Sequence, residues 1–176
     1  SLHDALPILD RLEMTGSPTP VLEGVRERRG DFALSRSGSR VYFPPGRQAT
    51  ERLVLLDREG RELEVLGEPG QFRDPEFSPD GSRVAVRRYD PELGNDIWLI
   101  ELDRGVSSRF TLSPESDLFP IWSPEGDRIV FSSHRKRRGL YMKPADGAGA
   151  PKRIHSMSSA HALDWSADGR LLVYGS

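Results

Sequence analysis

A short hairpin-forming pattern recurs four times along the chain, and it limits the possible folds more than any other feature. In each copy a large apolar residue precedes a serine, and a glycine follows three residues after that serine. Proline at the first central position, present in two of the copies, and a glycine with positive φ favour a tight turn. Each copy therefore predicts a strand, a turn and a returning strand. The copies are Ala33–Phe43, Glu76–Val86, Phe119–Ser133 and Asp164–Tyr174.

The spacing of the copies predicts a repeat architecture. Their turn glycines, Gly38, Gly81, Gly126 and Gly169, lie 43, 45 and 43 residues apart. A period of about 40–45 residues is typical of the four-stranded blades of a β-propeller. We therefore expect an all-β fold, a β-propeller fragment of four-stranded antiparallel blades. A chain of 176 residues holds about four blades' worth of sequence, so we expect the ring to be incomplete.

The second strand of each copy is apolar on both of its faces. Val84 and Val86 alternate with Ala85, and Ile129 and Phe131 alternate with Val130. A sheet with one face in water would instead alternate apolar with polar residues. We therefore expect each blade to be packed between neighbours, and this stacking to dominate stability.

The repeat pattern divides the chain into six expected segments. Residues 1–8 have no counterpart in the repeats and form a tail that is either non-native or disordered, and residues 9–29 form the outer strands of an incomplete blade. Three blades follow at 30–70, 71–116 and 117–159, and residues 160–176 give the first strands of a truncated blade. The chain begins with Ser1 and stops just after a strand, so we expect a piece of a longer protein whose remaining blades are partners of this segment.

The composition excludes several classes of function. With 25 basic and 27 acidic residues the net charge is −2, which gives no field for nucleic acid. No apolar run approaches the roughly 18 residues that cross a bilayer, so we expect no membrane contact by this segment. The absence of cysteine removes disulfides, thiolate nucleophiles and cysteine-ligated zinc.

The amino-acid sequence of the repeats resembles that of a known family. The pattern W-S-P-[DE]-G-x-R-[IV]-x-[FV], followed by D-I-W-L-I-E-L-D-R-G at Asp96–Gly105, is similar to the TolB-type, WD-related bacterial propeller repeat. Longer stretches, among them DFALSRSGSRVYFPPG and SSRFTLSPESDLFPIWSPEGDRIVFSS, resemble the C-terminal propeller region of bacterial serine/threonine protein kinases. This resemblance implies an extracytoplasmic (periplasmic or cell-surface) sensor or interaction module, joined through a membrane span to a cytoplasmic kinase. Two copies depart from the pattern, with Arg36-Ser37 in place of Pro-Asp and with Ala167 in place of proline.

The sequence carries no catalytic motif. It has no glycine-rich loop, H-R-D or D-F-G of a kinase and no G-x-S-x-G of a serine hydrolase. Its four histidines do not have metal-binding spacing, and we expect no cofactor and no metal. We interpret the turn serines Ser35, Ser78, Ser123 and Ser166, and the turn acids Asp80, Glu125 and Asp168, as structural groups that cap local N–H groups.

The connections fall into two sets, which predict where a partner binds. The first-to-second and third-to-fourth strand turns are short and uniform, whereas the second-to-third strand loops, on the opposite face of the disc, are long and irregular. Binding residues tend to lie on variable loops over a rigid scaffold. We therefore expect a protein or peptide partner to meet the loop face, although the basic run there is more often simply solvated. The candidate residues on that face are Arg87, Tyr89, His134, Arg135, Lys136, Arg137 and Arg138.

Three functions fit such a propeller. The first is a non-catalytic interaction or sensing module, in the extracytoplasmic part of a larger bacterial protein such as a kinase. The second is the propeller that filters substrates for a serine peptidase of the prolyl-oligopeptidase or dipeptidyl-peptidase type. The third is a polysaccharide-active propeller enzyme, which requires acids on the inner strands along the central channel, and the sequence places none there. Fold alone does not choose among them.

Overall fold

The described part of the chain is built entirely of strands. The computed structural model describes residues 32–42, 51–156 and 161–175, and in these ranges it contains no helix. The all-β prediction is therefore confirmed, while the expected tail at 1–8 and the outer strands at 9–29 lie outside the described residues. The strands are β1 (Phe32–Leu34), β2 (Arg40–Tyr42), β3 (Glu51–Leu56), β4 (Glu62–Phe77), β5 (Arg83–Asp90), β6 (Gly94–Glu101), β7 (Val106–Arg109), β8 (Asp117–Trp122), β9 (Arg128–Ser133), β10 (Gly139–Pro144), β11 (Lys152–Ser156), β12 (His161–Trp165) and β13 (Leu172–Gly175).

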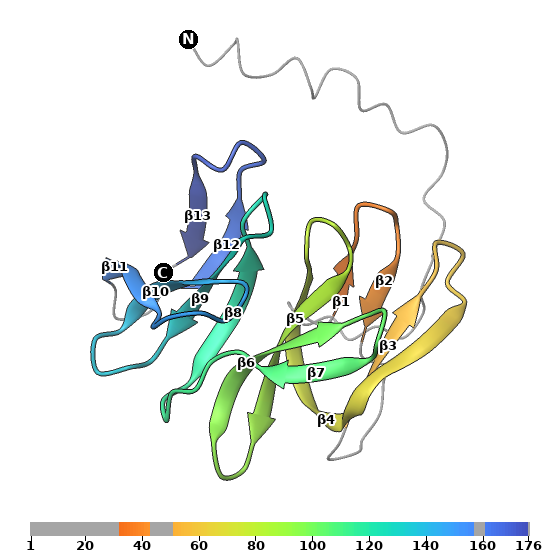
Figure 1. The fold of residues 1–176 in the computed structure, drawn as a ribbon, viewed down its shortest axis with the longest axis horizontal. Helices are drawn as coiled ribbons and strands as arrows, with labels where there is room; N and C mark the ends of the chain where they lie inside the picture. Colours follow the sequence, from red (N-terminus) through yellow and green to blue (C-terminus); the bar gives the residue numbers. More distant parts are fainter. Residues whose placement is uncertain (1–31, 43–50, 157–160, 176) are drawn as a thin grey trace.

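These strands form sheets in which chain neighbours pair antiparallel. One sheet contains β1 to β7 in chain order, a second contains β8 to β11, and β12 pairs with β13. Figure 1 shows the first sheet and the strands β8 to β13 lying side by side as two groups. Within the described ranges, β13 does not pair with β1, so no hydrogen-bonded ladder joins the two ends of the array. The sheets therefore form an open array, as expected for a propeller fragment.

One long strand, β4, links the first two repeats. From Glu62 to Gly70 it pairs with β3, and from Gln71 to Phe77 it pairs with β5. The chain thus passes from the outer edge of one set of strands to the inner edge of the next without leaving extended conformation. The boundary that we expected after residue 70 lies within β4, where the strand changes its partner. The division into blades as a whole stays a prediction.

The turn chemistry predicted from the repeats is confirmed. The four turn glycines have φ between 71° and 92°, a region that favours glycine. In the second repeat, the Ser78 Oγ accepts a hydrogen bond from the backbone N–H of Arg83 at 2.9 Å and donates one to Asp80 at 2.6 Å. Ser166 has the equivalent pair of hydrogen bonds in the last repeat. These serines close their own hairpins, as the structural interpretation requires.

The third repeat uses a different acid from the one expected. The Ser123 hydroxyl donates to Asp127 at 2.7 Å and not to Glu125. The extra methylene of glutamate carries its carboxylate past the turn, and Glu125 instead lies against Gly169 of the next repeat. The prediction that Glu125 caps its own turn was therefore wrong.

The β9 strand shows that a sheet is packed on both of its faces. Ile129 and Phe131 belong to the core that β9 shares with β6, whereas Val130 belongs to the core that it shares with β12. All three side chains are fully buried. For β9 the expectation drawn from its doubly apolar sequence is confirmed, and burial of this apolar area stabilises the stack. The expectation was wrong for β13, where Val173 and Tyr174 are 55% and 41% exposed.

The two end strands leave apolar side chains in contact with water. Phe32 and Leu34 on β1 are 53% and 58% exposed, and Val173 on β13 is 55% exposed. Each is part of a face that has no neighbouring sheet among the described residues. These faces are therefore candidates for self-association.

The fourth strand of the second repeat is short, since β7 covers Val106–Arg109. Beyond it the backbone N–H groups of Phe110 and Thr111 both donate to the carbonyl of Ile97, and the Thr111 hydroxyl donates to the buried Asp96 at 2.9 Å. This bonding turns the chain out of the ladder.

Candidate functional site

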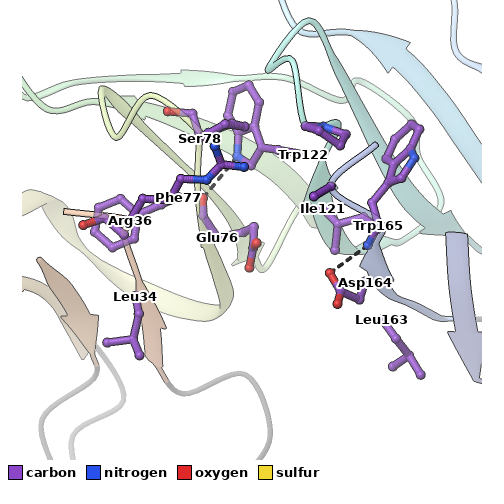
Figure 2. A pocket seen from close by; sticks show the side chains of 14 residues that line it. Leu34, Arg36, Glu76, Phe77, Ser78, Ile121, Trp122, Leu163, Asp164 and Trp165 are labelled. Carbon is purple, nitrogen blue, oxygen red and sulfur yellow. Dashed lines mark hydrogen bonds between the residues drawn. The ribbon is translucent and has the colours of Figure 1, made fainter. Parts of the chain in front are cut away.

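The four inner strands bring their ends together around one pocket. β1, β4, β8 and β12 contact one another in sequence, and the pocket between them has a volume of about 230 Å³. We call it the axial pocket (Figure 2). Because each inner strand leads into a repeat turn, the pocket opens on the turn face. Its walls are Leu34, Ser35, Arg36, Glu76, Phe77, Ser78, Pro79, Ile121, Trp122, Pro124, Leu163, Asp164, Trp165 and Ala167.

Two tryptophans give the axial pocket rigid aromatic walls. The Trp122 indole N–H donates to the backbone carbonyl of Glu76 at 3.2 Å, and the Trp165 indole N–H donates to the carbonyl of Gly169 at 3.0 Å. Since both N–H groups are satisfied by backbone, the rings are held in place. A ligand in the pocket would therefore meet their carbon surfaces.

Two carboxylates of the axial pocket come from facing inner strands. Figure 2 shows Glu76 on β4 and Asp164 on β12 directed toward the space between these strands, with Ile121 of β8 between them. One oxygen of Asp164 accepts the backbone N–H of Trp165 at 2.8 Å. Arg36 also lines the pocket, but among the described residues no ion pair joins it to either acid. The pocket thus holds two acids and one base.

Burial changes the acidity of Glu76. Removal of water, and then the negative charge of Asp164, raise the pKa of Glu76 from 4.5 to about 7. A carboxyl group that has lost water and lies near a second negative charge is less readily ionised. A cation placed between them would reverse this shift, because an opposite charge favours the ionised carboxyl. The pocket is therefore suited to an ammonium or a guanidinium group.

These acids correct the sequence analysis, which placed none along the channel. Glu76 and Asp164 lie two residues before the repeat serines, where the other copies have Ala33 and Ile121. The sequence did contain a signal for this site, namely an acid in two copies at a repeat position that is apolar in the other two. Recognising it required knowing that this position faces the pocket. Within the described ranges, no three His, Cys, Asp or Glu side chains are grouped so as to hold a metal ion.

The structure brings Arg87 and Tyr89 together on the loop face. With Gln71, Arg73 and Asn95 they line a second pocket, of about 240 Å³. The charge of Arg87 is already balanced, because its Nε lies 3.0 Å from Asp74. Tyr89 is exposed and remains available for contact.

The basic run on the next loop separates into one structural residue and four exposed residues. Arg135 pairs with the buried Asp117 at 2.9 Å, and its guanidinium lies over the rings of Phe131 and Tyr141. It therefore holds the loop to its sheet. His134, Lys136, Arg137 and Arg138 are exposed. The backbone N–H of His134 donates to the carbonyl of Ser116, whose hydroxyl lies 3.4 Å from the Asn95 amide, so the two candidate loops adjoin. A partner at these residues stays a prediction.

Repeated antiparallel sheets, stacked face to face with their inner strands around a pocket, define the β-propeller class of protein. Within that class the chain belongs to the PD40 family, the TolB beta propeller domain, which matches residues 32–176. The resemblance to TolB-type propellers noted in the sequence is confirmed at this level. Propeller domains of this type are generally non-catalytic. Among the described residues there is no helix of the length and apolarity needed to cross a membrane.

The relatives include a TolB protein and a peptidase. The chain is 29% identical over 103 residues to the protein TolB homolog of Chlorobium luteolum (58% of this chain, 23% of the relative). It is also 29% identical over 107 residues to the uncharacterized peptidase YuxL of Bacillus subtilis (57% of this chain, 16% of the relative). The crystal structure of TolB from Acinetobacter baumannii matches 87% of this chain and 43% of its own at 14% identity, with a TM-score of 0.64. That structure supports the fold, and the chain spans less than a quarter of either sequence relative.

Proposed function

We propose that the chain is the non-catalytic propeller segment of a larger bacterial protein and that it binds a protein or peptide partner, taking a basic side chain of that partner into the axial pocket. One observation carries the proposal. Glu76 and Asp164 face each other in a pocket with aromatic walls, and no ion pair joins either of them to a base among the described residues.

The energetics of Glu76 support a cationic group. Glu76 is partly buried, and a desolvated carboxylate that lacks a counter-charge is costly, so this residue destabilises the folded chain at neutral pH. Groups that reduce stability in this way are concentrated at functional sites. A guanidinium or ammonium would compensate the charge, and its aliphatic stem would pack on Trp122 and Trp165.

We further propose that the parent protein is extracytoplasmic and associated with a serine/threonine kinase. This proposal is supported by the amino-acid sequence of the repeats, which resembles the propeller region of such kinases. The exposed loop residues Tyr89, His134, Lys136, Arg137 and Arg138 would then offer a second contact surface on the opposite face. The reading frames beside this segment test the parent, since a kinase domain and a membrane span should be encoded upstream.

The binding test uses the three tryptophans of the chain as reporters. Trp122 and Trp165 line the axial pocket, whereas Trp98 lies outside it beneath Arg88. Chain labelled with ¹⁵N at tryptophan is titrated with Ac-Ala-Arg-Ala-NH₂ and, in parallel, with Ac-Ala-Gln-Ala-NH₂. We expect the indole signals of Trp122 and Trp165 to move in a saturable way with the arginine peptide alone, and the signal of Trp98 to stay fixed.

Two variants separate binding from folding. Glu76→Gln should lower the affinity for the arginine peptide by about tenfold, because a charge-assisted hydrogen bond is replaced by a neutral one. Glu125→Gln changes an exposed acid outside the pocket and should leave the affinity within about twofold. Equal responses to the two peptides, or equal effects of the two variants, would refute a cation site.

The peptidase relative favours a second candidate, a propeller that filters peptide substrates for a hydrolase domain. The similarity to YuxL covers 16% of that protein, so only the propeller part is compared. A G-x-S-x-G domain encoded beside this segment would support this candidate. The axial pocket would then contact peptides on their way to the hydrolase.

The polysaccharide-active reading gains one supporting observation. Acids do lie on inner strands in the axial pocket, and a carboxyl with a raised pKa, such as Glu76, is suited to donate a proton. Release of reducing sugar from oligosaccharides by the chain, lost in Glu76→Gln, would establish this reading and displace the binding proposal.

A further inference from the structure

A second cavity lies between the sheet of β6 and β7 and the sheet of β10. It has a volume of about 340 Å³ and shares none of its lining residues with the axial pocket. We call it the Lys143 cavity. Its walls are Arg83, Leu99, Glu101, Ser108, Arg109, Phe110, Leu112, Lys143, Ala145, Asp146 and Gly147.

Lys143 is unusual because it occupies a core position. It lies opposite Ile129 in β10, as Ile100 lies opposite Val84 in the preceding repeat. Lys143 is only 7% exposed, whereas lysine is almost never fully buried without a partner. An apolar side chain serves this position in the other repeat, so packing does not require a lysine.

The ammonium of Lys143 has little compensation for its charge. Its Nζ donates to the carbonyl of Phe110 at 2.9 Å and lies 4.7 Å from the centre of the Phe110 ring. Among the described residues no carboxylate forms an ion pair with it. Burial, and then the charge of Arg135, lower the pKa of Lys143, and the nearby charge of Asp146 offsets this only in part. Two of its three donor positions have no hydrogen-bond acceptor within the described part of the chain.

The remaining charges of the cavity leave a positive balance. Arg109 is paired with Asp96 at 2.6 Å, and Glu101 is paired with Arg104. The Arg83 guanidinium donates to backbone carbonyls and lies over the Trp122 ring. It forms no ion pair in the described ranges, although its charge helps to lower the pKa of Asp80. Asp146 is exposed and caps its own turn.

From this geometry we infer that the Lys143 cavity is a binding site for a carboxylate with a short apolar stem. Lys143 and Arg83 would hold the anion by charge-assisted hydrogen bonds. The apolar walls formed by Leu99, Phe110 and Ala145 would hold the stem, and the volume is within the range of small-ligand pockets. The inference uses none of the residues that line the axial pocket and calls for a ligand of opposite charge. The two sites adjoin where Arg83 lies over Trp122, but each has its own reporter, so each proposal can fail without the other.

The test follows the lysines themselves. The chain has three lysines, Lys136, Lys143 and Lys152, and the first and last are exposed. The 176-residue chain, labelled with ¹³C at the lysine ε-carbon, is titrated with Ac-Ala-Leu-OH as a chain-end carboxylate and with Ac-Ala-Glu-Ala-NH₂ as a side-chain carboxylate. Ac-Ala-Gln-Ala-NH₂ is the neutral control. We expect the Lys143 signal alone to shift in a saturable way, with the tighter of the two acidic peptides identifying the source of the carboxylate.

Variants and a pH titration complete the test. Lys143→Met should lower the affinity for the tighter acidic peptide by at least about tenfold. It should not lower the thermal midpoint of unfolding, since methionine can pack as the apolar Ile100 does at the equivalent position of the preceding repeat. Lys152→Met, the matched surface control, should change the affinity by less than about twofold. Binding of the carboxylate should raise the measured pKa of Lys143. The inference is overturned if the three lysine signals respond alike, if the neutral peptide binds equally well, or if the Lys143 signal does not move with either acidic peptide.

Discussion

Replacing Glu76 by glutamine is the sharpest test of the axial pocket. The substitution keeps the size of the side chain and removes its ability to ionise. In the folded chain the pKa of Glu76 is raised from 4.5 to about 7, first by burial and then by Asp164. Between these two values the folded state holds a proton that the unfolded state has released. Stability must therefore fall as the pH rises through this window.

The size of the effect follows from the displacement of the pKa. One pKa unit corresponds to about 1.4 kcal/mol, so the free energy of unfolding should decrease by about 3 kcal/mol between about pH 4.5 and about pH 7. Glu76→Gln lacks this dependence. The variant should match the wild type near pH 4.5 and exceed it by about 3 kcal/mol at pH 8.

Urea denaturation followed by far-UV circular dichroism, repeated from about pH 4.5 to about pH 8, measures this difference. Subtracting the wild-type curve from the variant curve cancels the titration of Asp117, whose pKa is raised to about 6 by burial. Asp168→Asn is the control, because the Ser166 hydroxyl lowers the pKa of the exposed Asp168 and any effect of that acid lies below the window. Parallel curves for Glu76→Gln and the wild type across the window would refute the argument that Glu76 is desolvated.

Four further substitutions test the fold. Ser123→Ala should cost about 1–2 kcal/mol in urea denaturation, because the fully buried hydroxyl closes its hairpin through two hydrogen bonds; a variant as stable as wild type would show that the turn closes without it. Gly139→Ala should be far more damaging than Gly81→Ala, since a Cβ at 139 would meet a backbone oxygen at 2.0 Å while a Cβ at 81 meets nothing within 4 Å. Gly81→Ala should cost about 1 kcal/mol of strain, and equal melting temperatures for the two would contradict this ranking. Val173→Lys should reduce self-association in sedimentation velocity by charging the exposed face of β13, and identical distributions for variant and wild type would exclude that face.

The loop residues show the limit of reasoning from loop length and charge. Irregular loops and a basic run correctly predicted where the chain is exposed, since Lys136, Arg137 and Arg138 face water. The same signal could not separate Arg135 from them. Its pairing with Asp117 depends on a carboxylate contributed by a strand 18 positions earlier in the chain, and nothing in the run itself marks that contact.

The amino-acid sequence by itself determined the hairpins, their period and the burial of both faces of the second strands that lie within the stack, as in β5 and β9. These features are local, because a serine and a glycine close each turn, with an acid within six residues in three of the four copies, and apolar residues on both faces need no particular neighbour to be recognised as buried. Only the tertiary structure showed that Glu76 faces Asp164 and that Lys143 lies in a cavity with Arg83. It also showed that β4 pairs with β3 along its first half and with β5 along its second half. Desolvation and charge pairing depend on which surfaces face each other after the sheets stack. The pockets therefore became visible only when the repeats were placed side by side.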